Sequence, residues 1–466
     1  MKTLKASCRK MKYRVEKKDI IWGYLSQVLN IASGLLLLPF ILYFLSQEDV
    51  GVWYVFITFI GLIQLLEFGF LPTISRYISY VFAGADDISD KCIPECNEKN
   101  EVNVSLLSNV IFASRRIYLL VSLIAFLIIS VGGTYYLSTL DYSGDRKLLY
   151  FSWLIYGSAT VILFYFGHYN ALLKGRGDQT QLNKVVVCSK LTNIICAIPL
   201  LYLGYGLLSL SIGMLCSVVV DRVLVRLSVF DSNASETIKA FQLKRTKDYT
   251  MTIWKNAKLM GVVQLGNFLT VRGSVLIVSS VIGLEAAAMY GFTLQITSIA
   301  VIVSSMYFGL QLPYMNSEQV KGNIEGIKRV FCRSLGLSWV LFFSFSCSLL
   351  ALGPYILSLI SQDTQLLPSI MLLFFLVAAF LEMNHSLCTA FLTTKNEIVF
   401  MWPLFITGVM ISLCSIISAY FYGLWGVILS QLILQLLYNN WKWPLLVFRE
   451  LNISGFKAII SLLRLK

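Results

Sequence analysis

Long apolar runs, each bounded by a short polar or basic segment, recur along the whole chain. A helix needs about 20 predominantly apolar residues to cross roughly 30 Å of hydrocarbon, so the pattern predicts twelve membrane-spanning helices. The first half of the chain holds six, at 20–45, 51–80, 117–137, 149–172, 185–203 and 206–226. The second half holds six more, at 258–282, 286–313, 330–353, 366–391, 398–420 and 424–448. The last two are separate helices only if Tyr422 and Gly423 form a turn.

Composition agrees with lipid as the solvent. The 466 residues are 57% hydrophobic and 14% charged, whereas soluble domains carry roughly 25% charged residues. The expected fold class is therefore an all-α integral membrane protein.

The formal net charge of +13 first suggests nucleic acid as a partner, but the positions of the charges argue against it. Lysine and arginine gather between the apolar runs, in the N-terminal tail and in 81–116, 173–184, 227–257, 314–329, 392–397 and 449–466. This is the positive-inside pattern of membrane proteins. It predicts that both termini are cytoplasmic, and we expect no nucleic-acid partner.

The basic segment 227–257 is the longest interruption and predicts the domain organisation. It separates an N-terminal six-helix bundle, 20–226, from a C-terminal one, 258–448, and basic tails at 1–19 and 449–466 flank the two. Within the segment, Ile238, Phe241 and Leu243 alternate with lysine and arginine, as in an amphipathic helix on anionic headgroups or in a solvated linker.

The two halves are weakly similar in the same chain order. Phe68-Gly69-Phe70, for example, corresponds to Phe308-Gly309-Leu310. An even number of spans in each half requires a parallel repeat, so we expect two related bundles around a central cavity.

Signatures of bond-making chemistry are missing from the sequence. It contains no phosphate-binding loop of the form Gly-x-x-x-x-Gly-Lys-Ser/Thr, and only two histidines. The sequence indicates binding and movement of a substrate, so we expect no enzyme activity, no cofactor and no metal site.

Arg272 is the most informative polar residue, because it lies near the middle of the predicted span 258–282. An arginine at the centre of a membrane helix costs about 2.5–3.5 kcal/mol on insertion scales. It must face water, an anionic ligand or an acidic partner. We identify Arg272 as a candidate phosphate-binding residue, with Gln264 at the margin of the same face. The alternative is an internal salt bridge to Glu67 or Glu382.

Other polar residues inside the predicted spans are weaker candidates. Glu67 and Arg76 could line the cytoplasmic mouth of the cavity, pair locally, or reach the membrane interface. His168 and Asn30 could line the cavity, although polar residues at helical spacing usually join membrane helices to each other.

Glu382 and His385 are three residues apart, on adjacent turns of one helix face. A carboxylate beside an imidazole is a candidate proton or ion-coupling relay. The alternative is a buried pair that locks the bundle.

Several segments resemble one family of membrane proteins. The sequence LSQEDVGVW at 45–53, followed by GLIQLLEFGF at 61–70 and by Arg76, is similar to the beginning of Wzx-type O-antigen flippases. The sequence QLGNF at 264–268, leading into IGLEA at 282–286 and Tyr290, resembles their seventh and eighth spans. These motifs are diffuse hydrophobic patterns spread thinly over the chain.

The resemblance implies the multidrug/oligosaccharidyl-lipid/polysaccharide exporter superfamily. Its flippases carry undecaprenyl-diphosphate-linked oligosaccharide from the cytoplasmic to the periplasmic leaflet of the bacterial inner membrane by alternating access, for lipopolysaccharide biosynthesis. Expected partners are that lipid-linked oligosaccharide and membrane lipids, with an O-antigen polymerase and a chain-length regulator as further candidates. Other exporters of the superfamily, for capsule or exopolysaccharide units or for cationic drugs, are the alternative function. Family cavities are cationic, and Arg272 fits that role. The acidic residue common near this part of the seventh span has no counterpart here, which leaves an ion-coupling carboxylate unassigned.

Overall fold

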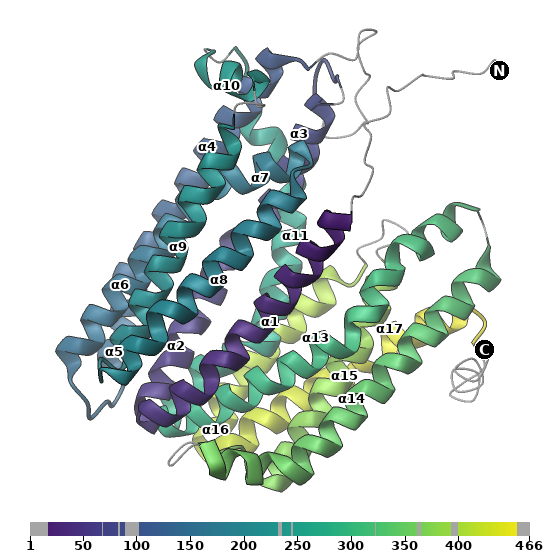
Figure 1. The fold of residues 1–466 in the computed structure, drawn as a ribbon. Helices are drawn as coiled ribbons and strands as arrows, with labels where there is room; N and C mark the ends of the chain where they lie inside the picture. The colour runs from purple at the N-terminus through teal and green to yellow at the C-terminus, as the bar shows by residue number, and fades with distance from the viewer. Residues whose placement is uncertain are drawn as a thin grey trace. The chain divides into compact units, whose positions relative to one another are not determined.

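The computed structural model describes residues 17–67, 69–82, 84–88, 102–231, 235–243, 246–321, 323–360, 365–392 and 399–453. Most of the two predicted basic tails, 1–19 and 449–466, lies outside these residues. The described chain is built from helices (Figure 1). This confirms the all-α class, which suits a bilayer because a helix satisfies every backbone polar group within its own segment.

Eleven helical stretches of the described residues are long and apolar enough to cross a membrane. They are formed by α1 (Lys17–Phe44), α2 (Gln47–Gln64), η1 (Leu65–Glu67), α3 (Phe70–Phe82), α4 (Val104–Leu127), η2 (Ile128–Gly133), α5 (Thr134–Thr139), α6 (Arg146–Tyr165), α7 (Gly167–Arg176), α8 (Gln179–Tyr202), α9 (Leu207–Val229), α11 (Thr250–Val271), α12 (Gly273–Val281), α13 (Leu284–Lys321), α14 (Ile324–Ile360), α15 (Ser369–Leu392), α16 (Met401–Leu437) and α17 (Asn439–Glu450). The chain is a multi-pass membrane protein.

The longest stretch, 401–450, contains two crossings because α16 reverses direction at Gly423. The backbone of Gly423 has φ 56° and ψ −137°, a conformation that favours glycine. Twelve residues of straight helix would separate Ser418 from Ser430 by about 18 Å, yet their hydroxyl oxygens are 2.9 Å apart. The turn predicted at Tyr422-Gly423 is confirmed, and with it the count of twelve crossings.

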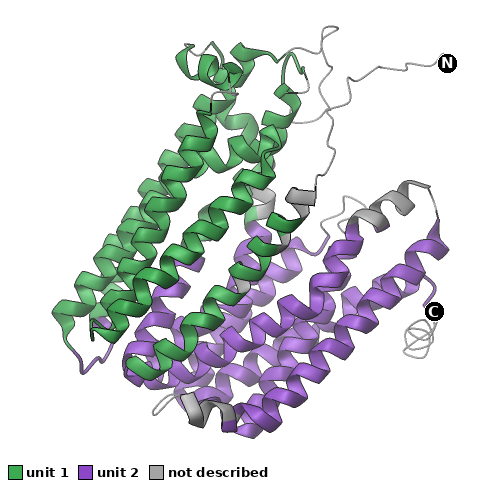
Figure 2. Cartoon of the chain, in the orientation of Figure 1, with its two compact units in different colours: residues 1–44, 62–138, 145–261 green, residues 45–61, 139–144, 262–466 purple. Residues whose placement is uncertain are grey.

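The chain divides into two compact units (Figure 2). Unit 1 contains residues 1–44, 62–138 and 145–261, and unit 2 contains 45–61, 139–144 and 262–466. Within unit 1, α8 packs against α1 and α9, and α6 packs against α4 and α9. Within unit 2, α13 packs against α14 and α15, and α12 against α16. The six-helix bundles, the parallel repeat and the central cavity stay predictions.

The segment between α9 and α11 contains a short helix, α10 (Ser235–Gln242), which packs on α4. The side-chain amide oxygen of Asn109 on α4 accepts hydrogen bonds from the backbone N–H groups of Thr246 and Lys247. Lys247 also donates to Asp87 at 2.7 Å, and Tyr249 donates to the same carboxylate. These hydrogen bonds lower the pKa of Asp87 below its usual value. The basic segment is therefore part of unit 1 and is tied to α4 and to Asp87 within it.

Close backbone approach explains one glycine in unit 2. A Cβ atom built on Gly51 of α2 would lie 2.2 Å from the carbonyl oxygen of Leu284, the first residue of α13. Small residues allow membrane helices to approach in this way.

We predict that Gly51→Ala lowers the melting temperature of the detergent-solubilised protein. Alanine has a higher helix propensity by about 1 kcal/mol, but forcing atoms into a packed contact typically costs about 1–3 kcal/mol. Gly309→Ala is the matched control, because no atom lies within 4 Å of its added Cβ. Its melting temperature should be unchanged or higher. Equal melting temperatures for the two variants would contradict the proposed close contact.

Candidate functional site

Arg272 lies at a break between two helices, in the middle of the membrane span Gly261–Val281. The single helix predicted for 258–282 is instead α11, ending at Val271, and α12, beginning at Gly273. The backbone N–H of Arg272 donates to the carbonyl of Phe268 at 2.8 Å, and its own carbonyl accepts from Val275 at 3.1 Å. The backbone at the break is therefore hydrogen-bonded although the helix is interrupted.

The side chain of Arg272 is exposed at the surface of the protein. Its Cδ lies 3.5 Å from the position that a Cβ would occupy on Gly61, and the ring of Phe268 lies 3.3 Å from the same position. The arginine stem thus lies against Gly61 of α2, beside Phe268. The guanidinium carries five N–H donors in a fork that matches phosphate oxygens. Gln264, on α11, is exposed as well.

A second cluster in unit 2 joins Glu382 and His385 of α15 to Asn440 of α17. The imidazole Nε2 is 3.7 Å from the Glu382 carboxylate, and Nδ1 is 3.0 Å from the Asn440 side-chain oxygen. With that oxygen as acceptor, Nδ1 carries the proton. The ring of His385 is buried, and the second carboxylate oxygen of Glu382 is buried with no hydrogen-bond partner among the described residues. This geometry suits the predicted buried pair, and the relay stays a prediction.

In unit 1, Tyr118 brings together two of the predicted residues. Its hydroxyl donates a 2.7 Å hydrogen bond to Glu67 at the end of η1, and its ring centroid lies 6.5 Å from that of His168. The Nδ1 atom of His168 is 3.2 Å from the carbonyl of Tyr165, and the ring is buried. Glu67 and His168 therefore share one polar region of α4 and its neighbours.

Arg76 and Asn30 have contacts with other residues, outside the Tyr118 cluster. Both side chains are exposed. The Arg76 guanidinium sits 5.7 Å from the ring of its neighbour Tyr77, and the backbone carbonyl of Asn30 accepts from Ser33 at 3.4 Å.

The structure adds an ion pair that the sequence analysis did not identify. Arg222 on α9 contacts Asp221 at 2.8 Å and donates to the carbonyl of Phe166 at 3.2 Å. The positive charge of Lys190 on α8 attracts the Asp221 carboxylate. The positive charge of Arg222 likewise attracts the Glu67 carboxylate. The signal was present as an Asp-Arg dipeptide inside the sixth apolar run and a lysine inside the fifth.

Both carboxylates considered as alternative partners of Arg272 have partners inside their own units. Glu67 is hydrogen-bonded to Tyr118, and Glu382 contacts His385. Glu67 and Glu382 are thus engaged locally, and the side chain of Arg272 is exposed.

Solved structures of transporters share this fold. An inward-facing multidrug resistance MATE family transporter of the MOP superfamily aligns with 94% of this chain and 100% of its own, at 14% identity and a TM-score of 0.69. An outward-facing transporter of the same description covers 96% and 94% at 15% identity and a TM-score of 0.58. A point mutant of the Vibrio cholerae MATE transporter VcmN covers 95% and 98% at 13% identity and a TM-score of 0.57. No family model and no curated protein matches the chain. The chain therefore has the MATE transporter fold.

We predict that Arg222→Met strongly destabilises the protein. Removing one partner of a buried ion pair costs about 3–5 kcal/mol; Lys190 also acts on Asp221 and offsets part of this cost. The double variant Asp221→Asn, Arg222→Met removes both charges of the contacting pair but leaves Lys190 without Asp221, so it should recover part of the lost stability. Thermal unfolding in detergent measures the series. Arg226→Met, one turn along the same helix at an exposed position, is the control. A double variant no more stable than Arg222→Met would contradict the pairing.

Proposed function

We propose that this chain is an alternating-access exporter of the MOP superfamily, and that it flips undecaprenyl-diphosphate-linked O-antigen repeat units. Transport would run from the cytoplasmic to the periplasmic leaflet of the bacterial inner membrane, with both termini cytoplasmic. The MATE fold supports the transporter class. The similarity of segments 45–53, 61–70 and 264–290 to Wzx-type flippases supports the substrate.

The position of Arg272 is the main support for the proposed substrate class. Its side chain is exposed near the middle of a membrane span, where a positive charge is costly unless its surroundings stabilise it. A diphosphate supplies a matching anion, since arginine binds phosphate oxygens through paired, charge-assisted hydrogen bonds. In this proposal the glycan and the polyprenyl tail make the remaining contacts.

The superfamily alternative, a cationic-drug exporter, would use a carboxylate to hold its substrate. The spans carry three carboxylates away from their ends, at Glu67, Asp221 and Glu382. Tyr118, Arg222 and His385 respectively contact them. A cation at Glu67 or Asp221 would have to displace Tyr118 or Arg222, which favours an anionic substrate.

We predict that Arg272→Ala reduces translocation of a lipid-linked oligosaccharide by about 10- to 100-fold. A hydrogen bond to a charged group contributes about 1.5–3 kcal/mol, and each 1.4 kcal/mol corresponds to about tenfold. Arg272→Lys keeps the charge without the forked donors, so its translocation rate should lie between those of Arg272→Ala and the unmodified protein. Proteoliposome flipping assays and surface O-antigen in cells provide the measurement.

Arg333→Ala is the matched control, because this exposed arginine lies nearer the end of a span in the same unit. It should transport like the unmodified protein. Normal translocation by both Arg272 variants would refute the phosphate-binding role. Efflux of a cationic dye, with no oligosaccharide flipping, would favour the drug exporter.

We also predict that a membrane potential drives the flipping. With a cytoplasm-negative potential, each negative charge moved outward gains about 2.3 kcal/mol per 100 mV, so two phosphate charges gain about 5 kcal/mol. Proteoliposomes with an imposed potential should flip faster than depolarised ones, and reversing the potential should slow them. Identical rates in the three conditions would rule out electrical driving of the diphosphate.

A further inference from the structure

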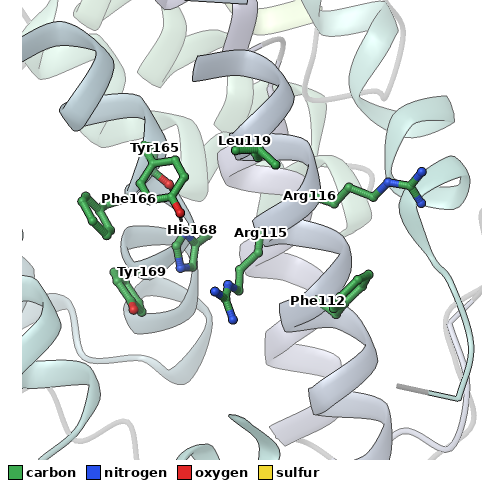
Figure 3. A pocket seen from close by; sticks show the side chains of 8 residues that line it. All are labelled: Phe112, Arg115, Arg116, Leu119, Tyr165, Phe166, His168 and Tyr169. Carbon is green, nitrogen blue, oxygen red and sulfur yellow. Dashed lines mark hydrogen bonds between the residues drawn. The ribbon is translucent and has the colours of Figure 1, made fainter. Parts of the chain in front are cut away.

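A hollow opens on the surface of unit 1 between α4 and the junction of α6 with α7 (Figure 3). Its volume is about 490 Å³, and it remains partly open to the outside. Arg115, Arg116, Tyr165, His168 and Tyr169 supply its polar lining. Of these residues only His168 was a candidate for the transport cavity, and the proposed flippase mechanism gives Arg115 and the two tyrosines no role.

The hollow carries an uncompensated positive charge. Arg115 is exposed and forms no hydrogen bond or ion pair with the described part of the chain. Arg116, its neighbour, pairs with Asp248 at 3.0 Å. One of the two arginines is therefore balanced, and the guanidinium of Arg115 is available to an anion from outside the protein.

Further polar groups around Arg115 lack partners. The hydroxyl groups of Tyr165 and Tyr169 make no hydrogen bond to any described residue. The Nε2 atom of His168 is buried, also without a hydrogen-bond partner there. Figure 3 shows the His168 ring between Tyr169 and the Arg115 guanidinium. The O–H groups of phenols and the N–H groups of guanidinium are donors that suit the oxygens of a phosphate.

An apolar surface leads away from the hollow along both helices. On α4, the exposed side chains of Leu119, Leu123 and Leu127 follow Arg115 at helical spacing, and on α6 Leu154 and Phe151 share a face with Tyr165. Exposed leucine and phenylalanine on a membrane helix suit acyl chains. The charged hollow and this surface together match an amphiphile with an anionic head.

The position of Arg115 along its span agrees with headgroup depth. The span Val104–Thr139 has 36 residues, about 54 Å of helix, whereas hydrocarbon is about 30 Å thick. The helix therefore extends well beyond the hydrocarbon, and Arg115 precedes its exposed apolar stripe. Phe241 of the surface helix α10 lies 6.3 Å from the ring of Tyr169. Tyrosine and arginine are typical of this interface.

We propose that this hollow binds the phosphate of one anionic phospholipid in the leaflet on the side of α10. Arg115 binds the phosphate, Tyr165 and Tyr169 donate to the headgroup oxygens, and one acyl chain lies along Leu119, Leu123 and Leu127. The bound lipid would join α4 to the α6–α7 junction. This site is independent of the transported substrate and of Arg272.

The test is lipid retention by the full-length protein, measured by native mass spectrometry in detergent, with thermal unfolding alongside. Phosphatidylglycerol is the probe and phosphatidylcholine is the neutral comparison. The unmodified protein should retain phosphatidylglycerol preferentially and melt several degrees higher in its presence. Arg115→Ala should reduce that preference at least fivefold, Arg115→Lys should restore part of it, and Arg333→Ala should leave it unchanged. Arg115 is exposed, so its variants are expected to fold, and their melting temperatures without lipid verify this.

Three outcomes would overturn the proposal. Equal retention of phosphatidylglycerol by Arg115→Ala and the unmodified protein would exclude this site. Inorganic phosphate that raises the melting temperature as much as the lipid would indicate a simple anion site. Displacement of phosphatidylglycerol by a lower concentration of undecaprenyl phosphate would assign the hollow to a polyprenyl lipid. The readout is binding, so failure here leaves the flippase proposal untouched, and failure of the Arg272 series leaves this site untouched.

Discussion

The absence of water from the hydrocarbon is the constraint on which the rest of this structure depends. Backbone groups satisfy one another within helices, even where the chain breaks at Arg272. Charged side chains cannot do this alone. Each needs a partner inside the protein, contact with water, or a ligand. Whether a charged side chain in a span is buried with a partner or exposed therefore distinguishes structural residues from candidate binding residues.

Two kinds of polar residue result from this constraint. Arg222 is buried, contacts Asp221 and donates to a backbone carbonyl, and His385 is buried between Glu382 and Asn440. Such groups fix helices relative to one another inside each unit, and removing one partner is costly. Arg272 and Arg115 have exposed side chains instead. Their exposure is the arrangement on which the two binding proposals rest.

The lengths of the apolar runs predicted the helical class and, with a turn at Gly423, the twelve crossings, because bilayer thickness sets the length of a membrane-spanning run. The sequence also predicted that Glu382 and His385 would be neighbours, since three residues is a local spacing. It could not find Asn440 or Tyr118, which lie 55 and 51 residues from their partners and are brought there by helix packing. Lys190, Asp221 and Arg222 were missed because each lies within a long run whose average composition is apolar. The break at Arg272 had a weak local signal in Gly273, which lowers helix propensity.

The charged residues inside the spans bear on the charge of the proposed substrate. Among the described residues, the carboxylates in the span interiors have neighbours in their own units, as the contacts of Glu67, Asp221 and Glu382 show. The chain as a whole has 38 basic and 25 acidic residues, but most of that surplus lies between the spans and in the tails. For the proposed substrate, an anionic lipid-linked diphosphate, the exposed Arg272 supplies a charge of opposite sign. A cationic drug would instead have to compete with Tyr118 or Arg222 for a carboxylate.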